Sequence, residues 1–332
     1  MKAFFIDGYG KDNGRIGHLP DPEVGPDEVL VKVHAASVNL LDSKIRKGEF
    51  KLILPYRFPL VLGNDLAGVV LRVGSHVSRF KPGDEVYGRP HEESIGTFAE
   101  LIAVSQDALA LKPVNLDMEQ AASIPLVALT AWQVLVETAQ LKKGQKVLVH
   151  AGSGGVGSIA IQLARHLGAF VATTTSTRNV EWVKALGADV VIDYKQQHFD
   201  RLLHHYDVVL NSLDAGTLEK SLKVLKPGGR LISISGPPTA QFAKAQGLNW
   251  GLQQVMGLLS YGIRRKAHKL GVSYSFVFMR ANGEQLREIS ALIESGVIKP
   301  VVDRMFEFSD TAQALSYVEQ GRAKGKVVIR VA

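Results

Sequence analysis

Hydrophobic positions between residues 146 and 235 fall into short apolar runs separated by stretches of helical periodicity. The apolar runs predict strands at 146–150, 170–174, 189–193, 207–211 and 230–235. The stretches between them predict helices at 156–167, 179–186 and 217–225. Because strands that alternate with helices form βαβ units, we expect a parallel sheet that helices cover on both faces.

Residues 1–110 follow a different pattern, in which short strands are separated by turns that contain glycine and proline. The expected strands are Val29–Val33 with Lys32 outward, Leu66–Val73, Glu85–Tyr87 and Phe98–Val104. A short helix is expected at Ser43–Lys47. Strands at this spacing are typical of a curled antiparallel β domain.

The pattern changes again near residue 117, where Asp117 and Gln120 predict a capping box that opens a helix at 118–124. Helical spacing recurs at 130–138, and Gly236–Pro237–Pro238 breaks the chain before an irregular stretch that ends near 271. The elements expected after this break are a helix at 248–261, a strand at 272–278, helices at 283–295 and about 310–320, and a strand at 326–331.

Composition narrows the class of protein without deciding its function. The chain of 332 residues is 46% hydrophobic and 21% charged, which is ordinary for a globular protein. The net charge of +7 is interpreted as scattered over the surface, with one compact basic run at 264–266. Such a surface favours anionic ligands, and without an aromatic-rich RNA motif it makes nucleic-acid binding unlikely.

The absence of cysteine excludes disulfide bonds, thiolate metal sites and a catalytic thiol. No run approaches the roughly 20 apolar residues of a membrane helix, and the apolar stretch within Met1–Asp7 is too short for a signal peptide. We therefore expect a cytoplasmic protein without a membrane partner.

A glycine turn links the first strand of the alternating region to its first helix. Gly152, Gly154 and Gly157 spell G-x-G-x-x-G between an apolar strand and a helical pattern. Small residues let the backbone approach a pyrophosphate, and the start of the helix offers free N–H groups and the positive end of its dipole. The sequence therefore predicts dinucleotide binding, the alternative being a tight turn without a ligand.

The second strand indicates which dinucleotide is bound. An acidic residue about 20 positions beyond the glycines binds the ribose of NAD, whereas arginine accommodates the 2′-phosphate of NADP. No Asp or Glu occurs between Gly157 and Val180, and the second strand leads into hydroxyl-bearing residues and Arg178. This pattern predicts NADP(H), unless Arg178 only decorates the start of the next helix.

At this point the chain resembles the medium-chain dehydrogenase/reductases, specifically the zinc-free branch of quinone oxidoreductases and enone reductases related to zeta-crystallin. The resemblance extends over nearly the whole chain. Besides the glycine turn, the motifs that carry it are Ala35–Asn39 with Asp42, Gly63–Gly68, Gly83–Tyr87, Gly96–Glu100, Pro125–Leu126 with Thr130–Ala131, Leu186–Asp189, Leu225–Gly229 and Gly325–Val328.

The resemblance implies an α/β fold with a central Rossmann doubly wound parallel sheet. It also implies a GroES-like, mainly antiparallel β catalytic domain formed by both chain ends. The expected domains are residues 1–120 completed by 270–332, and the dinucleotide-binding domain at 121–269. A homodimer joined through the Rossmann sheets is the expected assembly.

The chain departs from the zinc-dependent relatives at the places where they hold the metal. A cysteine and a His-Glu pair are expected there, but this sequence has Asp42, Asn64 and Asp65. These residues do not provide the usual tetrahedral nitrogen and sulfur ligands, so we expect no metal. Without a Lewis acid to stabilise an alkoxide, hydride addition to a quinone or a conjugated C=C bond is favoured over alcohol oxidation.

The resemblance also assigns site residues. The expected cofactor-binding residues are Asn39, Thr130, Ser153, Gly154, Gly155, Val156, Gly157, Ser176, Arg178, Tyr194, Leu213, Ser235, Gly236, Phe276, Phe278 and Lys326. Alternatives stay open for several of them. Thr130 could bond to its own helix, Tyr194 could pack at the sheet edge, and Lys326 could be solvated.

The candidates for the substrate pocket are Asn39, Asp42, Tyr56 and Phe276, with Tyr87 as a further pocket wall. For Asn39 and Asp42 the alternative is helix capping. No residue is identified as catalytic, and solvent is the expected proton source. The predicted function is NADPH-dependent reduction of quinones or α,β-unsaturated carbonyl compounds. The alternatives are an NADP(H)-binding redox sensor or RNA-associated protein with little catalysis, and a zinc-independent alcohol dehydrogenase.

Overall fold

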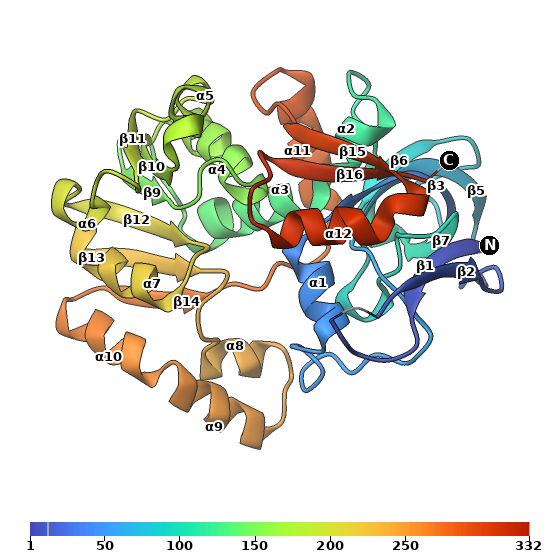
Figure 1. The fold of residues 1–332 in the computed structure, drawn as a ribbon, viewed down its shortest axis with the longest axis horizontal. Helices are drawn as coiled ribbons and strands as arrows, with labels where there is room; N and C mark the ends of the chain where they lie inside the picture. The colour runs from blue at the N-terminus through green and yellow to red at the C-terminus, as the bar shows by residue number, and fades with distance from the viewer. Residues whose placement is uncertain (12, 332) are drawn as a thin grey trace. The chain divides into compact units, whose positions relative to one another are not determined.

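The computed structural model describes residues 1–11 and 13–331, and the chain forms two compact units (Figure 1). The first unit comprises Met1–Leu129 and the chain from Arg280 onward, and the second comprises Thr130–Met279. Throughout the described residues, every helix is too short or too polar to cross a membrane.

The second unit is built on a parallel sheet whose six described strands follow the order β11-β10-β9-β12-β13-β14. Its strands are β9 (Lys146–Val149), β10 (Phe170–Thr175), β11 (Val190–Asp193), β12 (Tyr206–Asn211), β13 (Leu225–Ser233) and β14 (Ser273–Phe276). The strand order reverses between β9 and β12, and the crevice at such a reversal is where open parallel sheets bind ligands.

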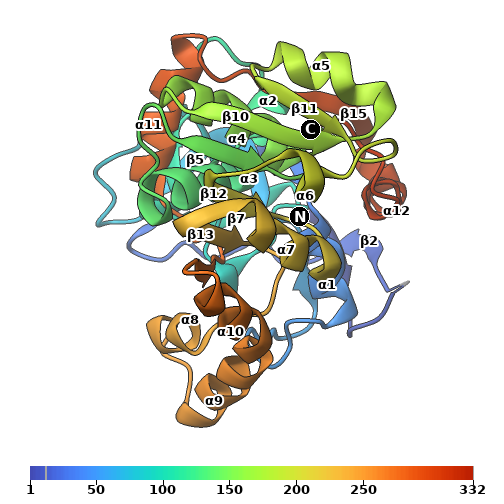
Figure 2. The same ribbon diagram turned by 90° about the vertical axis from the view of Figure 1, so that its left-hand side faces the viewer.

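Helices connect these strands and pack on the sheet. They are α4 (Gly155–His166), α5 (Val180–Ala185), α6 (Phe199–Leu202), α7 (Ala215–Ser221), α8 (Ala240–Ala245), α9 (Trp250–Leu259) and α10 (Tyr261–Lys269). Leu218 of α7 and Ile263 of α10 join Leu148 and Leu231 of the strands in one core cluster. Figure 2 shows α8, α9 and α10 as a group at one side of the sheet.

The first unit is rich in β structure. Its larger sheet has the order β15-β16-β3-β5-β6-β8, with β7 also paired to β3, and a smaller sheet has the order β2-β1-β4. The strands are β1 (Lys2–Ile6), β2 (Arg15–His18), β3 (Glu28–Val38), β4 (Leu60–Val61), β5 (Asp65–Val73), β6 (Glu85–Gly88), β7 (Leu101–Ser105), β8 (Leu109–Leu111), β15 (Val302–Glu307) and β16 (Lys326–Arg330). Among the described strand pairs of this first unit, only the pair of β15 and β16 is parallel.

Strands from both chain ends meet in this larger sheet, because β16 pairs antiparallel with β3. The helices of the first unit are α1 (Leu40–Lys47), α2 (Met118–Ala122), α11 (Gly283–Glu294) and α12 (Thr311–Glu319), and α3 (Pro125–Trp132) crosses the boundary and continues as a π-helix over Gln133–Thr138. The predicted capping box opens α2: the Gln120 N–H donates to Asp117 at 2.7 Å.

The limits of the two units differ from the domain boundaries expected from the sequence. Residues 121–129 lie with the first unit and 270–279 with the second, because β14 pairs with β13 and completes the parallel sheet. The expectation of an irregular stretch around helix 248–261 is wrong. This stretch holds three helices, and α10 escapes detection because Ile263 and Ala267 are its buried residues among many basic ones.

Candidate functional site

The glycine turn follows the central strand β9 and is held by main-chain hydrogen bonds within the turn and to β10. Gly154 N–H donates to Ala151 O at 2.9 Å, and Gly152 N–H donates to Thr174 O at 3.0 Å. A side chain on Gly157 would collide with the backbone of Ala151, and one on Gly152 would collide with the Thr173 hydroxyl. The glycines therefore allow β9, the turn and α4 to pack closely.

Helix α4 begins directly after this turn without a side-chain cap. Its N-cap is Gly154, which has no side chain that could accept a hydrogen bond from the N–H groups of the first turn. The first N–H groups of α4 lack an intrahelical partner, as in every α-helix, and the positive end of the helix dipole lies there. The predicted pyrophosphate residues Ser153–Val156 are half-buried at this point, so an anion can reach them.

The residues predicted for a 2′-phosphate come together at the ends of β10 and β11. Thr175 lies opposite Asp193 in the parallel ladder, and Tyr194 N–H donates to Thr175 O at 3.0 Å. Ser176 is half-buried, while Arg178 is exposed and the Tyr194 side chain is 60% exposed. The exposed ring answers one open question, because Tyr194 is not a packed side chain of the sheet edge.

An acidic side chain, Asp193, also lies at this end of the sheet. Its carboxylate accepts hydrogen bonds from the Thr177 hydroxyl at 2.6 Å, the Lys195 N–H at 3.0 Å and the Gln196 amide at 2.9 Å. The Thr177 bond is the main cause that lowers the pKa of Asp193. These three donors occupy the carboxylate.

The predicted residues after β12 and β13 also meet. The Ser235 hydroxyl donates to Leu213 O at 2.7 Å, and Gly236 N–H donates to the Ser233 hydroxyl at 2.8 Å. The sequence reading misses Asn211, whose Oδ1 accepts from Ser233 at 3.1 Å and whose Nδ2 is buried without a hydrogen-bond partner in the described part of the chain. Its position at the end of β12 is the signal that could have identified it.

Aromatic residues lie at the end of β14 and directly after it. Phe276 and Phe278 are half-buried, and the ring of Phe242 on α8 packs edge-on against Phe276 with centroids 5.0 Å apart. Val277 N–H donates to Ser233 O at 2.9 Å, so this segment continues along β13 beyond β14. Thr130 on α3 is buried, with 4% of its surface exposed.

The basic charge of the chain is concentrated in the second unit, contrary to the expectation of a scattered excess. Thr130–Met279 holds 17 Lys and Arg against 8 Asp and Glu, a net charge of +9. The rest of the chain holds 22 against 24, a net charge of −2. No Asp or Glu occurs in the sequence between Glu219 and Glu284. The unit that carries the glycine turn therefore attracts anions.

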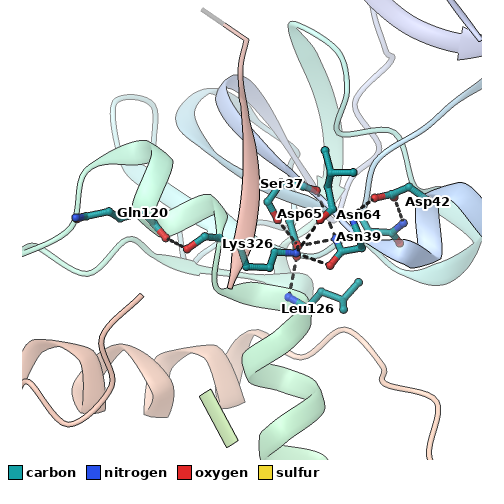
Figure 3. A network of polar contacts seen from close by, with 10 residues as sticks. Ser37, Asn39, Asp42, Asn64, Asp65, Gln120, Leu126 and Lys326 are labelled. Carbon is teal, nitrogen blue, oxygen red and sulfur yellow. Dashed lines mark hydrogen bonds and ion pairs between the residues drawn. The ribbon is translucent and has the colours of Figure 1, made fainter. Parts of the chain in front are cut away.

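A second candidate cluster is a buried polar network in the first unit (Figure 3). Its centre is Asp65, whose carboxylate accepts from the Ser37 hydroxyl at 2.6 Å, Asn39 Nδ2 at 2.9 Å and Lys326 Nζ at 3.3 Å. The other carboxylate oxygen accepts from Leu126 N–H at 2.7 Å. Asp65 thus joins β3, β5, β16 and the start of α3.

Lys326 is a buried member of this network and not a solvated side chain, since it is only 5% exposed. Its ammonium group donates to Asn39 Oδ1 and to Val38 O and forms an ion pair with Asp65. A buried ammonium group requires such compensation, because burial without a partner would be very unfavourable. The pair leaves the centre of the network electrically balanced.

Asp42 is fully buried at the other end of the network. Asn39 N–H donates to it at 2.7 Å and Asn64 Nδ2 at 2.6 Å. Burial is the largest influence and raises its pKa to about 7, although both hydrogen bonds oppose the shift. The Asn39 bond caps α1, so capping is one role of Asp42 in the structure.

The two tyrosines differ in their surroundings. Tyr56 is half-buried and its hydroxyl donates to Glu92 O at 2.6 Å. Tyr87 is fully buried in the core, and its hydroxyl donates to Leu286 O at 2.8 Å. The expectation that Tyr87 is a pocket wall is wrong, because β6 turns its side chain inward against α11. Burial raises the pKa of both hydroxyls.

The described residues contain no group of three or more His, Cys, Asp and Glu side chains that could hold a metal ion. At the places where zinc ligands occur in zinc-dependent relatives, the carboxylates of Asp42 and Asp65 are bonded to amide, hydroxyl and ammonium donors of the chain. The two carboxylates are therefore satisfied by protein donors, whereas Asn64 Oδ1 is buried without a hydrogen-bond partner among the described residues.

Comparison with known proteins places the chain and its fold in one class. A family described as Zinc-binding dehydrogenase matches residues 186–329, and a family described as Alcohol dehydrogenase GroES-like domain matches residues 25–114. The solved quinone oxidoreductase from Coxiella burnetii is similar over 100% of this chain and 99% of its own, with a TM-score of 0.85 and 31% identity.

Two curated relatives are each 40% identical over 341 residues, which cover 99% of this chain and 79% of the relative. They are the 2-methylene-furan-3-one reductase of Solanum lycopersicum and the chloroplastic NADPH-dependent alkenal/one oxidoreductase of Arabidopsis thaliana. The class is therefore an α/β oxidoreductase with a GroES-like unit, which confirms the predicted fold class. The chain belongs to the medium-chain dehydrogenase/reductase superfamily, in the branch of the quinone oxidoreductases and enone reductases.

Replacing Lys326 by Met should strongly destabilise the first unit, because the buried Asp65 carboxylate would lose the ammonium group with which it forms an ion pair. Removing one partner of a buried pair costs about 3–5 kcal/mol, and the remaining donors place the expected loss near the lower value. In thermal unfolding this is a drop of roughly 6–12 °C for a unit of this size. The exposed Lys81→Met should change little, and an equal drop in that variant would contradict the assignment.

The Asp42 carboxyl should make stability pH-dependent. Its folded pKa of about 7 lies above its ordinary value of 3.8, so the folded state holds the proton more tightly than the unfolded state between these values. This stabilisation is fully present below pH 3.8 and is lost as the pH rises through 7. Above that pH, Asp42 no longer makes the free energy of unfolding depend on pH. Asp42→Asn should flatten the fall in melting temperature between pH 5 and 8. Parallel curves for both proteins over this range would refute the shift.

Proposed function

We propose that this enzyme is an NADPH-dependent reductase that transfers hydride to the C=C bond of an α,β-unsaturated carbonyl compound or to a quinone. The observation that carries the proposal is the start of α4, where a glycine turn after the central strand leads to a helix without a side-chain cap. The relative named for NADPH and alkenals and the solved neighbour named for quinones support it.

NADPH is favoured over NADH by the end of β10. Ser176 and Arg178 provide a hydroxyl and a guanidinium group for a 2′-phosphate, and Asp193 is already occupied by three donors of the chain. The net charge of +9 on the same unit favours the more highly charged of the two cofactors.

The proposed cofactor residues divide by the part of the nucleotide that they would hold. Ser153–Gly157 would hold the pyrophosphate, and Ser176, Arg178 and Tyr194 the 2′-phosphate end. The remaining proposed contacts are Asn39, Thr130, Leu213, Ser235, Gly236, Phe276, Phe278 and Lys326. Met1–Leu129 with the chain from Arg280 onward is the proposed catalytic domain, and Thr130–Met279 is the proposed cofactor-binding domain.

In this reaction the protein mainly binds and orients NADPH and the acceptor. Bound NADPH supplies the hydride, and the acceptor's own carbonyl oxygen takes up the electrons, so a conjugated acceptor needs no metal. The hydroxyls of Tyr56 and Tyr87 donate to main-chain carbonyls and have raised pKa values, so neither is a suitable proton donor. We assign protonation of the product to solvent.

The same reasoning favours a zinc-free enzyme. Asp65 is neutralised by Lys326, and the remaining oxygen donors at this place come from Asp42 and Asn64. This set lacks the nitrogen and sulfur ligands of zinc dehydrogenases. A homodimer and a cytoplasmic location remain proposals from the family resemblance and the sequence, and one relative is named as chloroplastic.

The purified enzyme should oxidise NADPH in the presence of 2-alkenals, enones or small quinones, and a strong chelator should leave the rate unchanged. The readout is loss of NADPH absorbance, with alcohols and NADP⁺ as the control for alcohol dehydrogenase activity. No turnover above the blank for the whole acceptor panel would sink the proposal.

Arg178→Ala should weaken NADPH binding roughly tenfold and leave NADH binding nearly unchanged, because a hydrogen bond to a charged group contributes about 1.5–3 kcal/mol. The dissociation constants can be measured by titration of NAD(P)H fluorescence. Arg201→Ala, an exposed arginine of the same unit, is the matched control. Equal weakening of both cofactors would contradict the role assigned to Arg178.

A further inference from the structure

His150 is a buried histidine that the glycine motif does not include. It lies between β9 and the glycine turn, and its side chain is only 1% exposed. Its Nδ1 lies 3.1 Å from the Thr174 hydroxyl on β10, and its Nε2 lies 2.9 Å from the Ser221 hydroxyl on α7. The ring of Phe199 packs edge-on against the imidazole with centroids 4.7 Å apart. Each side of the imidazole therefore meets a different element of the unit.

The neighbouring bonds determine where the protons lie. Ser221 donates its one hydroxyl hydrogen to Thr217 O at 2.7 Å, so it accepts from His150 and Nε2 carries the imidazole proton. In a neutral ring Nδ1 is then an acceptor, and it takes the hydroxyl hydrogen of Thr174. Burial lowers the pKa of His150 to about 4, which keeps the ring neutral near pH 7.

The Thr174 hydroxyl connects the His150 ring to the glycine turn by hydrogen bonds. With its hydrogen on His150, its oxygen accepts the N–H of Ala151 at 3.2 Å. The main-chain oxygen of Thr174 accepts the N–H of Gly152. Ala151 has φ of +53°, a left-handed conformation that is unfavourable for a residue with a side chain. Two successive N–H groups at the start of the turn are thus fixed on one threonine.

We propose that His150 is a positioning residue for the nucleotide: it orients the Thr174 hydroxyl, which holds Ala151 in its left-handed conformation and so sets the glycine turn for the pyrophosphate. Ala151 O also accepts the Gly154 N–H. A change in the conformation of Ala151 would therefore move Gly154, the N-cap of α4. This inference rests on the proposed function, since it concerns the same nucleotide site.

The decisive comparison is between Thr174→Val and Thr174→Ser. Valine keeps the shape but removes the hydroxyl, and the dissociation constant of NADPH should rise about tenfold, whereas serine should bind almost as tightly as the wild type. Likewise His150→Leu should weaken binding, and His150→Asn should restore much of it because Oδ1 can replace the Nδ1 acceptor. Ser260→Ala removes another buried hydroxyl of this unit, one bonded to its own helix, and should leave binding unchanged.

Hydrogen exchange of the cofactor-free protein separates this inference from the proposed function. The Ala151 N–H should exchange about tenfold faster in Thr174→Val than in Thr174→Ser, whether or not NADPH binds. If wild type fails to bind NADPH, the proposed function fails and the exchange comparison still decides the role of Thr174. Unchanged exchange and unchanged NADPH affinity in folded Thr174→Val and His150→Leu would overturn the inference.

Discussion

The close packing of β9, the glycine turn and α4 is the constraint on which the second unit depends. A side chain at Gly157 would collide with the backbone of Ala151, so the helix could not start directly behind the strand. The same packing leaves the first N–H groups of α4 without a side-chain cap at the carboxyl end of the sheet. Folding and the proposed ligand binding thus use one feature: an unsatisfied helix terminus that is tolerable because solvent or an anion can satisfy it.

The polar network of the first unit solves the opposite problem, since its groups are enclosed. Asp65 accepts four hydrogen bonds, one of them from the counter-charge Lys326, and these contacts offset the cost of burying a carboxylate. Asp42 accepts two hydrogen bonds and has no ion-pair partner within residues 1–11 and 13–331, and burial raises its pKa. Within one network, the two buried carboxylates therefore differ in whether a counter-charge contacts them.

Local patterns in the sequence were sufficient to predict the strands of the parallel sheet, the glycine turn and the capping box of α2. Each of these features depends on residues that are neighbours in the sequence. The units' limits were not accessible in this way, since the place of 270–279 depends on β14 pairing with a distant strand. The alternatives for Lys326 stayed open for the same reason: its partners Asn39 and Asp65 lie more than 250 positions away. His150 escaped notice because a single histidine beside a glycine motif carries no periodic signal.

The stretch without acidic residues between Glu219 and Glu284 gives the two units unequal electrostatic fields. A diffusing polyanion would be drawn toward one unit before any specific contact forms, over a range of about 8 Å in physiological salt. Added salt would then slow the capture of a phosphorylated nucleotide more than it would hasten its escape, since short, partly buried contacts are screened least. Ionic strength would therefore change mainly the association rate of the nucleotide and have little effect on the bound complex.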